Sequence, residues 1–179
     1  WGSDRIPLVQ FGDINLGKWQ PIAKVERPHV YSWVMNNYWF TNFRATQEGE
    51  FKWSYYLTST RETGNAPATR FGWGSRVPLV SRVLPPGKVG SSKTSLSLLQ
   101  CDAPNLLLVE SRPAWDGKGL ILHWREVEGK NAALGLSHQP FASKVRRVDE
   151  VNAIEQTLKE NVSSLSFGPY EVKFLRLVP

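Results

Sequence analysis

The chain lacks paired cysteines and any long apolar run. Cys101 is the single cysteine among 179 residues, so the chain forms neither an internal disulfide nor a four-cysteine metal site. The longest aliphatic run, Leu106 to Val109, is far shorter than the roughly 20 apolar residues of a membrane-spanning helix. We therefore expect a soluble chain with no membrane among its partners, and the sequence assigns it no compartment.

The chain also lacks a recognisable leader. It opens Trp1-Gly2-Ser3-Asp4, and Met35 is its only methionine. This opening has neither the charged region nor the apolar region of a signal peptide. We expect a piece of a longer chain, or a processed chain, and such a piece can lack the chemistry that its parent performs.

Negative charge is missing from one long stretch. Between Glu62 and Asp102 the sequence has no acidic residue, and the whole chain carries a formal charge of +6. A basic excess raises nucleic acid as a possible partner. The basic residues in this stretch are spread singly, however, whereas nucleic-acid binders concentrate Lys and Arg along a helix or a stripe. We therefore expect no nucleic-acid partner and keep basic nucleic-acid binding as the weakest of three hypotheses.

Motifs for catalysis and metal binding are absent as well. The three histidines, His29, His123 and His138, lie far apart and fit no H-E-x-x-H spacing. No G-x-S-x-G elbow occurs, and the glycine-rich turns do not have the spacing of a P-loop. The residues alone therefore identify no catalytic group, no metal ligand and no cofactor site.

The sequence does contain the pattern of β-strands. Apolar and polar residues alternate with period two over residues 51–58, which is typical of a half-buried strand. A second aromatic-rich stretch at 38–46 precedes it, so we predict a hairpin there. Turn sequences such as Asp116-Gly117-Lys118-Gly119 separate further strands, which we expect at 95–101, 105–111, 119–127, 132–137 and 170–178.

Short strands joined by polar turns predict an all-β fold, an antiparallel β-sandwich with little helix. With 41% hydrophobic residues, the chain is able to bury a core, and we expect a single domain over residues 1–179.

Two stretches fit the predicted sandwich less well. Residues 65–86 are rich in Gly and Pro and predict a long loop with a helical turn at 66–70, and this loop is a candidate for function. In residues 144–162 apolar positions recur at intervals of three and four, which by itself favours an amphipathic helix.

Tryptophan is the most unusual component, with eight in the chain. Aromatic faces pack against the apolar faces of sugars, while Asn and Arg side chains form directed hydrogen bonds with hydroxyl groups. The segment 33–53 combines both kinds of residue. The alternative interpretation is that these rings fill the core or an interface between domains.

One long run resembles a known family. Residues 30–59, VYSWVMNNYWFTNFRATQEGEFKWSYYLTS, are similar to the C-terminal region of glycoside hydrolase family 38, the α-mannosidases, and the W-V-M-N-N-Y-W core is the most specific part. Four further blocks resemble that region in the same order and extend the similarity to nearly the whole chain: 7–12 with Trp19, 70–73 with 78–79, 105–129 and 168–176.

The resemblance implies a β-sandwich of the galactose-mutarotase-like supersandwich type. It also implies a strand at 145–151 that leads into a loop, against the helical spacing of that stretch. Enzymes of this family are retaining α-mannosidases whose zinc ligands, nucleophile and acid/base carboxylate lie in an N-terminal catalytic domain. None of those motifs matches a position here, so we expect no cofactor in this piece and place the zinc in the catalytic domain.

The resemblance also implies a function. We expect a non-catalytic C-terminal domain that packs on its own N-terminal catalytic barrel and lends a loop to the rim of the sugar pocket, with a mannose-containing glycan as a further partner. The residues predicted to face the pocket or the neighbouring domain lie within the matched motif: Asn36, Asn37, Trp39, Asn42 and Arg44. The alternative is a hairpin whose buried amides satisfy strand ends.

Two observations would separate these functions. An independent carbohydrate-binding module, the second hypothesis, needs an exposed row of at least two tryptophans. A domain that has lost its neighbour should instead expose an apolar patch where the barrel packs, and we expect such a patch around Trp19, Trp33 and Trp73.

Overall fold

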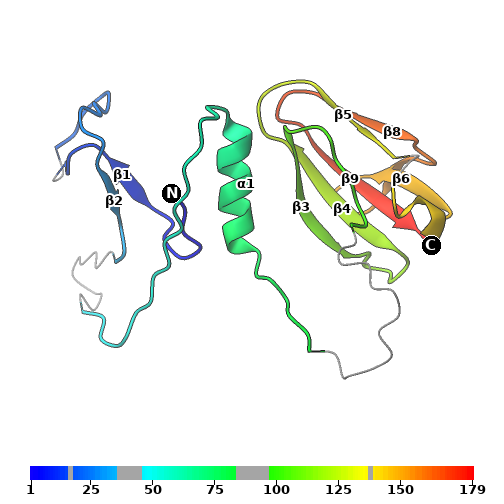
Figure 1. Cartoon of the computed structure of the whole chain (residues 1–179), viewed down its shortest axis with the longest axis horizontal. Coiled ribbons are helices and arrows are strands. Elements are labelled where there is room, and N and C mark those ends of the chain that lie inside the picture. The colour runs from blue at the N-terminus through cyan, green and yellow to red at the C-terminus, as the bar shows by residue number, and fades with distance from the viewer. Residues whose placement is uncertain (16–17, 36–45, 84–96, 137–138) are drawn as a thin grey trace. The chain divides into compact units, whose positions relative to one another are not determined.

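The computed structural model describes residues 1–15, 18–35, 46–83, 97–136 and 139–179 (Figure 1). The chain divides into two compact units. Unit 1 consists of Trp1–Ser59 and Gly74–Pro78, and unit 2 consists of Thr60–Trp73 and Leu79–Pro179.

Unit 2 contains two antiparallel sheets. The larger has the order β3-β4-β9-β6-β7 and the smaller pairs β5 with β8. The strands are β3 (Leu106–Pro113), β4 (Leu120–Glu126), β5 (Ala132–Gly135), β6 (Arg147–Val151), β7 (Thr157–Lys159), β8 (Ser164–Phe167) and β9 (Val172–Val178). Strands predicted at 105–111, 119–127, 132–137 and 170–178 are thereby confirmed.

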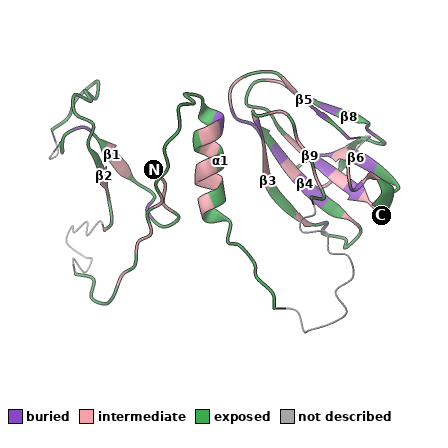
Figure 2. Ribbon diagram, viewed as in Figure 1, coloured by how far each residue is buried: buried purple, intermediate pink, exposed green. Residues whose placement is uncertain are grey.

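The main core lies between these two sheets. Alternate residues of β4 and β9, such as Trp124 and Leu175, face Leu134 of β5 and Phe167 of β8 in one cluster of buried side chains. Figure 2 shows the buried residues gathered on these strands. Two sheets that enclose an apolar layer form a sandwich, which confirms the predicted all-β class.

Helix α1 (Asn65–Arg76) covers the free edge of β3. The Arg70 guanidinium donates to the carbonyl of Leu106, and the Trp73 indole N–H donates to the carbonyl of Val109 at 3.0 Å. At the start of the helix, the Ala66 amide donates to the Glu128 carboxylate, a negative group favoured at a helix N-terminus. The stretch predicted to be a long loop therefore begins as a full helix. Its sequence, with two internal glycines, has weak helix propensity, so docking on β3 supplies the stability.

The prediction at 145–151 is also resolved. This stretch passes from a short 3₁₀ turn, η1 (Ala142–Lys144), into β6, so the strand implied by the family resemblance is confirmed and the helical spacing was misleading. Val148 packs in the main core, whereas Val151 packs in a second cluster on the outer face of the larger sheet. Residues three apart in a strand point to opposite faces, and apolar cover on both faces produces the apparent helical spacing.

Unit 1 has little regular structure in its described residues. Strands β1 (Val9–Phe11) and β2 (Val30–Ser32) pair antiparallel, and Gly2 forms an isolated bridge with Tyr56. The strand predicted at 51–58 was wrong: alternation is present, but among the described residues its backbone makes only that bridge. Its predicted partner, 38–46, lies outside the described residues except for the last position. The described part of the strand predicted at 95–101 is likewise irregular.

Buried apolar side chains are scarce in unit 1. Ile6 is the one that is buried among its described residues, and Figure 2 shows β1 and β2 as intermediate or exposed. A body of this size normally needs a substantial buried core to be stable by itself. The described residues of unit 1 do not provide one.

Candidate functional site

The five residues predicted from the sequence motif, Asn36, Asn37, Trp39, Asn42 and Arg44, lie outside the described residues. The patch predicted around three tryptophans has a mixed outcome. Trp19 is 86% exposed and Trp33 is also exposed. Trp73 is half-buried and holds helix α1 against β3, so it belongs to the internal packing of unit 2.

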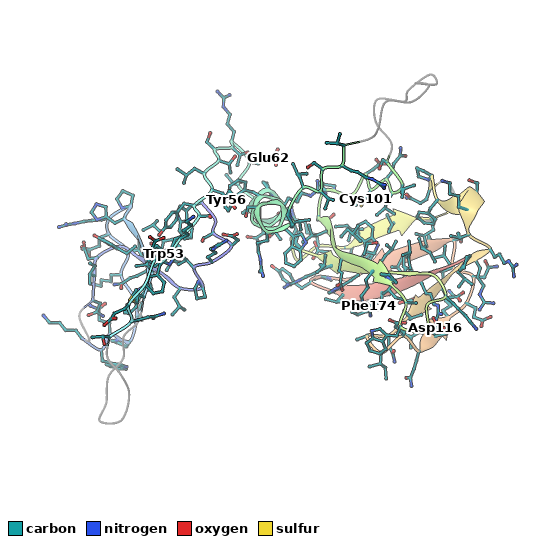
Figure 3. All side chains as sticks on the ribbon, turned by 90° about the horizontal axis from the view of Figure 1, so that it is seen from below. Trp53, Tyr56, Glu62, Cys101, Asp116 and Phe174 are labelled. Atoms are coloured by element: carbon teal, nitrogen blue, oxygen red, sulfur yellow. The ribbon has the colours of Figure 1, made fainter. Side chains whose placement is uncertain are left out.

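The best-defined polar cluster lies on the outer face of the larger sheet, over a small apolar cluster. The apolar cluster consists of Ala114, Ile121 and Val151, with Phe174 packed against them. The hairpin that joins β3 to β4, residues 114–119, and the loop 152–156 lie beside it. Figure 3 labels Asp116 in the hairpin and Phe174 in β9.

Arg112 is the centre of the polar cluster. Its Nη1 lies 2.5 Å from Glu155 Oε1, and its Nε lies 3.7 Å from Glu110 Oε2. The guanidinium carbon also lies 5.2 Å from the centre of the Trp115 ring, within the range of a cation–π contact. One cation therefore joins two carboxylates and an aromatic ring.

Glu155 is the strained member of this group. Its φ angle is 64°, which is unfavourable for a residue with a side chain. The loop is built to hold it, because Asn152 Oδ1 accepts hydrogen bonds from the amides of Ile154 and Gln156. The Glu155 side chain is only 7% exposed. Its Oε2 accepts a hydrogen bond from the backbone N–H of Trp115, with 3.0 Å between the nitrogen and the oxygen. The strained backbone thus delivers a carboxylate that fixes both Arg112 and the hairpin.

A second arginine clamps the tip of the hairpin. Arg176 Nη2 lies 2.6 Å and 2.5 Å from the two carboxylate oxygens of Asp116, and it also donates to the carbonyl of Lys118. The hydrogen bond from Arg176 lowers the pKa of Asp116. Gly119 has a φ of 105°, and a side chain there would collide with the Leu177 carbonyl, so the turn requires glycine at this position.

The part of the chain that the structure describes offers no zinc site. No three His, Cys, Asp or Glu side chains gather there in a possible metal site. His123 stacks on Phe174 with ring centres 4.5 Å apart, and burial lowers the pKa of its imidazole. Because no group of three possible ligands forms among the described residues, those residues do not fit a zinc site, and we derive no chemical step through a metal.

Burial also raises the pKa of the Cys101 thiol. A raised pKa leaves a thiol protonated and unreactive.

Over the described ranges, no helix is long and apolar enough to cross a membrane.

The opposite end of the sandwich is fastened by another carboxylate. Glu126 is 0% exposed. Its oxygens accept hydrogen bonds from the backbone amides of Glu128, Gly129 and Tyr170 and from the side-chain amide of Asn105. Burial alone would raise the pKa of Glu126, but these hydrogen bonds lower it to about 2. This buried anion joins three separate segments of unit 2.

Sequence reasoning missed the outer cluster. Turn chemistry at 116–119 located the hairpin, but Glu155 lies 43 residues after Arg112, and no local pattern connects them. The run Arg112 to Gly117, which spans the end of β3 and the start of the hairpin, was the available signal, because it places a tryptophan at a turn where polar residues are usual.

Comparison with protein families gives one match. The family described as glycosyl hydrolases family 38 C-terminal beta sandwich domain matches residues 106–173, from β3 to the start of β9. Comparisons with curated proteins and with solved structures give no match. The motif at 30–59 lies outside the matched range. Within residues 106–173 the chain is thus similar to the C-terminal β-sandwich domain of family 38 glycosyl hydrolases, as the sequence resemblance implied.

Proposed function

We propose that the chain is the non-catalytic C-terminal region of an α-mannosidase-like glycoside hydrolase and that it packs on the catalytic barrel of its parent protein. The observation that carries the proposal is the family match over strands β3 to β9. In this role the sandwich supports a reaction centre that other residues supply.

Exposed apolar surface supports a missing neighbour. Leu79, Val80 and Val83, in the segment that follows helix α1, are almost completely exposed. The described residues of unit 1 add further exposed apolar side chains, Trp19 among them, and Ile6 is the one apolar side chain buried there. Gathered exposed apolar residues mark interaction surfaces in soluble proteins, so the catalytic domain is the proposed cover for these segments.

An activity assay tests the proposal. The 179-residue chain is expressed alone and joined to the catalytic domain of its parent protein, and each is assayed with an aryl α-mannoside in the presence of zinc. We expect turnover from the joined protein and none from the chain alone. Robust zinc-dependent turnover by a clean preparation of the chain alone would contradict the proposal.

A substitution tests the contact itself. In the joined protein, Leu79→Asp should lower the free energy of unfolding by about 2 kcal/mol or more, because it places a charge where a leucine is buried at the interface. Ser81→Asp, two positions along the same exposed segment, is the matched control and should have little effect. Equal effects of the two variants would show that Leu79 does not contact the catalytic domain.

A further inference from the structure

We propose that Trp115 is a stacking platform for a pyranose ring, so that the hairpin 114–119 is a glycan-binding site on the sandwich. The site needs no residue outside unit 2. It rests on the proposed function only in the choice of sugar, which is a neutral α-mannoside.

The indole ring has one covered face and one open face. The Arg112 guanidinium lies over the ring at 5.2 Å from its centre, and yet Trp115 as a whole is 69% exposed. So large an exposed fraction requires the opposite face to be in contact with water. A flat, solvent-exposed aromatic face suits the C–H face of a pyranose, since both surfaces are apolar and their burial is favourable.

The backbone of the hairpin is held before any ligand arrives, and Arg112 contacts the Trp115 ring. Glu155, which has a strained backbone and a buried side chain, accepts a hydrogen bond from the Trp115 amide and pairs with Arg112. Arg176 clamps the next residue, Asp116. A hairpin that is already ordered loses less conformational entropy on binding, and strained residues concentrate at functional positions.

The polar surroundings favour a neutral ligand over an anionic one. Formal charges cancel in the hairpin and its ion pairs: Arg112, Lys118 and Arg176 balance Glu110, Asp116 and Glu155. Both arginines are already engaged in ion pairs, while Glu110 and Asp116 are about half-exposed. Carboxylates accept hydrogen bonds from sugar hydroxyls but repel phosphate groups, which disfavours nucleotides as the stacked ligand.

Indole resonances provide a direct test. The full chain labelled with nitrogen-15 is titrated with methyl α-D-mannopyranoside and with an α-linked mannotriose, each to about 50 mM because a single stacked ring supports only weak affinity. The Trp115 N–H signal is identified by its loss in Trp115→Phe. We expect this signal to shift in a saturable way, with a larger response to the trisaccharide.

Four variants make the test specific. Because Trp115→Ala and Trp115→Phe lack the indole signal, binding by the variants is followed through the backbone amide signals of the hairpin 114–119. Trp115→Ala should abolish saturation, a loss of at least about tenfold, whereas Trp115→Phe should keep binding within about fivefold because it retains an aromatic face. Glu155→Gln should weaken binding about threefold or more by loosening the support. Trp19→Ala removes a tryptophan that is even more exposed, at 86%, and should leave binding unchanged.

The proposal fails if neither sugar shifts the Trp115 signal, or if saturable binding persists in Trp115→Ala. It also fails if Trp115→Ala weakens association with the catalytic domain and no sugar binds, since the hairpin is then a protein contact. These outcomes leave the Leu79→Asp comparison unaffected, so failure of the glycan site is distinguishable from failure of the proposed function.

Discussion

At the scale of single residues, Glu126 is a buried carboxylate that connects three segments of unit 2. Substitution by Gln would turn an NH₂ group toward amide donors that now share a carboxylate. We expect Glu126→Gln to lower the free energy of unfolding by about 2–4 kcal/mol, because buried donors lose a charged acceptor. Urea denaturation measures the change. Glu160→Gln, an exposed carboxylate, should change it by less than about 0.5 kcal/mol.

The same residue predicts a dependence on pH. Hydrogen bonds hold the pKa of folded Glu126 at about 2, below its ordinary value of 4.5. The unfolded chain therefore binds a proton first as the pH falls, so the stabilisation is complete above pH 4.5 and declines as the pH falls toward 2. The loss of stability between these values should be shallower in Glu126→Gln. Parallel acid-unfolding curves for the two proteins would contradict this assignment.

Two glycines form a matched pair that separates backbone strain from crowding. Gly117 and Gly129 have φ angles of 72° and 71°, so alanine is similarly strained at both positions. A side chain at Gly117 would meet open space, whereas one at Gly129 would lie 2.8 Å from the Tyr170 ring. Gly117→Ala should cost about 1 kcal/mol and Gly129→Ala about 2 kcal/mol more, as measured by thermal unfolding. Equal costs would mean that Tyr170 moves aside freely.

At this scale, a contact could be predicted from the sequence only where its residues lie close together along the chain. The hairpin 114–119 was predictable because Gly and Asp report local backbone conformation. The ion pair of Arg112 with Glu155 was not predictable, since a pair between a strand and a distant loop leaves no periodic pattern in the sequence. The buried role of Glu126 was likewise not predictable, because an acidic residue at the end of a strand is expected to face solvent unless the amide groups that donate to it are known.

At the scale of elements, helix α1 illustrates an override of local propensity. Residues 65–76 contain Gly72 and Gly74, which contributed to the prediction of a loop. Docking of Arg70 and Trp73 on the edge of β3 makes the helix the better state, and it covers backbone groups through which an open edge could recruit another strand.

Two substitutions in α1 should act in opposite directions. Trp73→Phe keeps an aromatic ring but removes the donor to the Val109 carbonyl, so opening of the helix should become easier by about 1 kcal/mol. Gly74→Ala adds a methyl group where nothing lies within 4 Å and should make opening harder by about 0.5–1 kcal/mol. Amide hydrogen exchange within α1 measures both. Faster exchange in Gly74→Ala would show that the added methyl group is not tolerated.

Strand prediction succeeded where the folded chain supplies a partner strand. Strands β3 and β4 pair with each other along their length. The stretch 51–58 has equally clear alternation but makes one bridge. Alternation reports which face of a strand is apolar. Whether a partner strand is present is a separate, non-local condition.

At the scale of the whole molecule, the two units differ in how much apolar surface they bury. The buried apolar residues of the described chain lie in unit 2, apart from Ile6. We expect residues 60–179 expressed alone to unfold cooperatively and residues 1–59 expressed alone to lack a thermal transition, since cooperativity requires a shared core. Near-ultraviolet circular dichroism during heating checks both fragments. A cooperative transition in 1–59 would locate a core that the described residues do not reveal.

The order of the larger sheet has a consequence for synthesis of the protein. Its third strand, β9, follows β4 and β6 in the chain and pairs with β4 on one side and with β6 on the other. A nascent chain on the ribosome therefore holds two half-sheets that have no common partner until β9 has been made. A premature stop shortly before Val172 would release a polypeptide with two unsatisfied strand edges, which is a substrate for quality-control proteases and a source of aggregates.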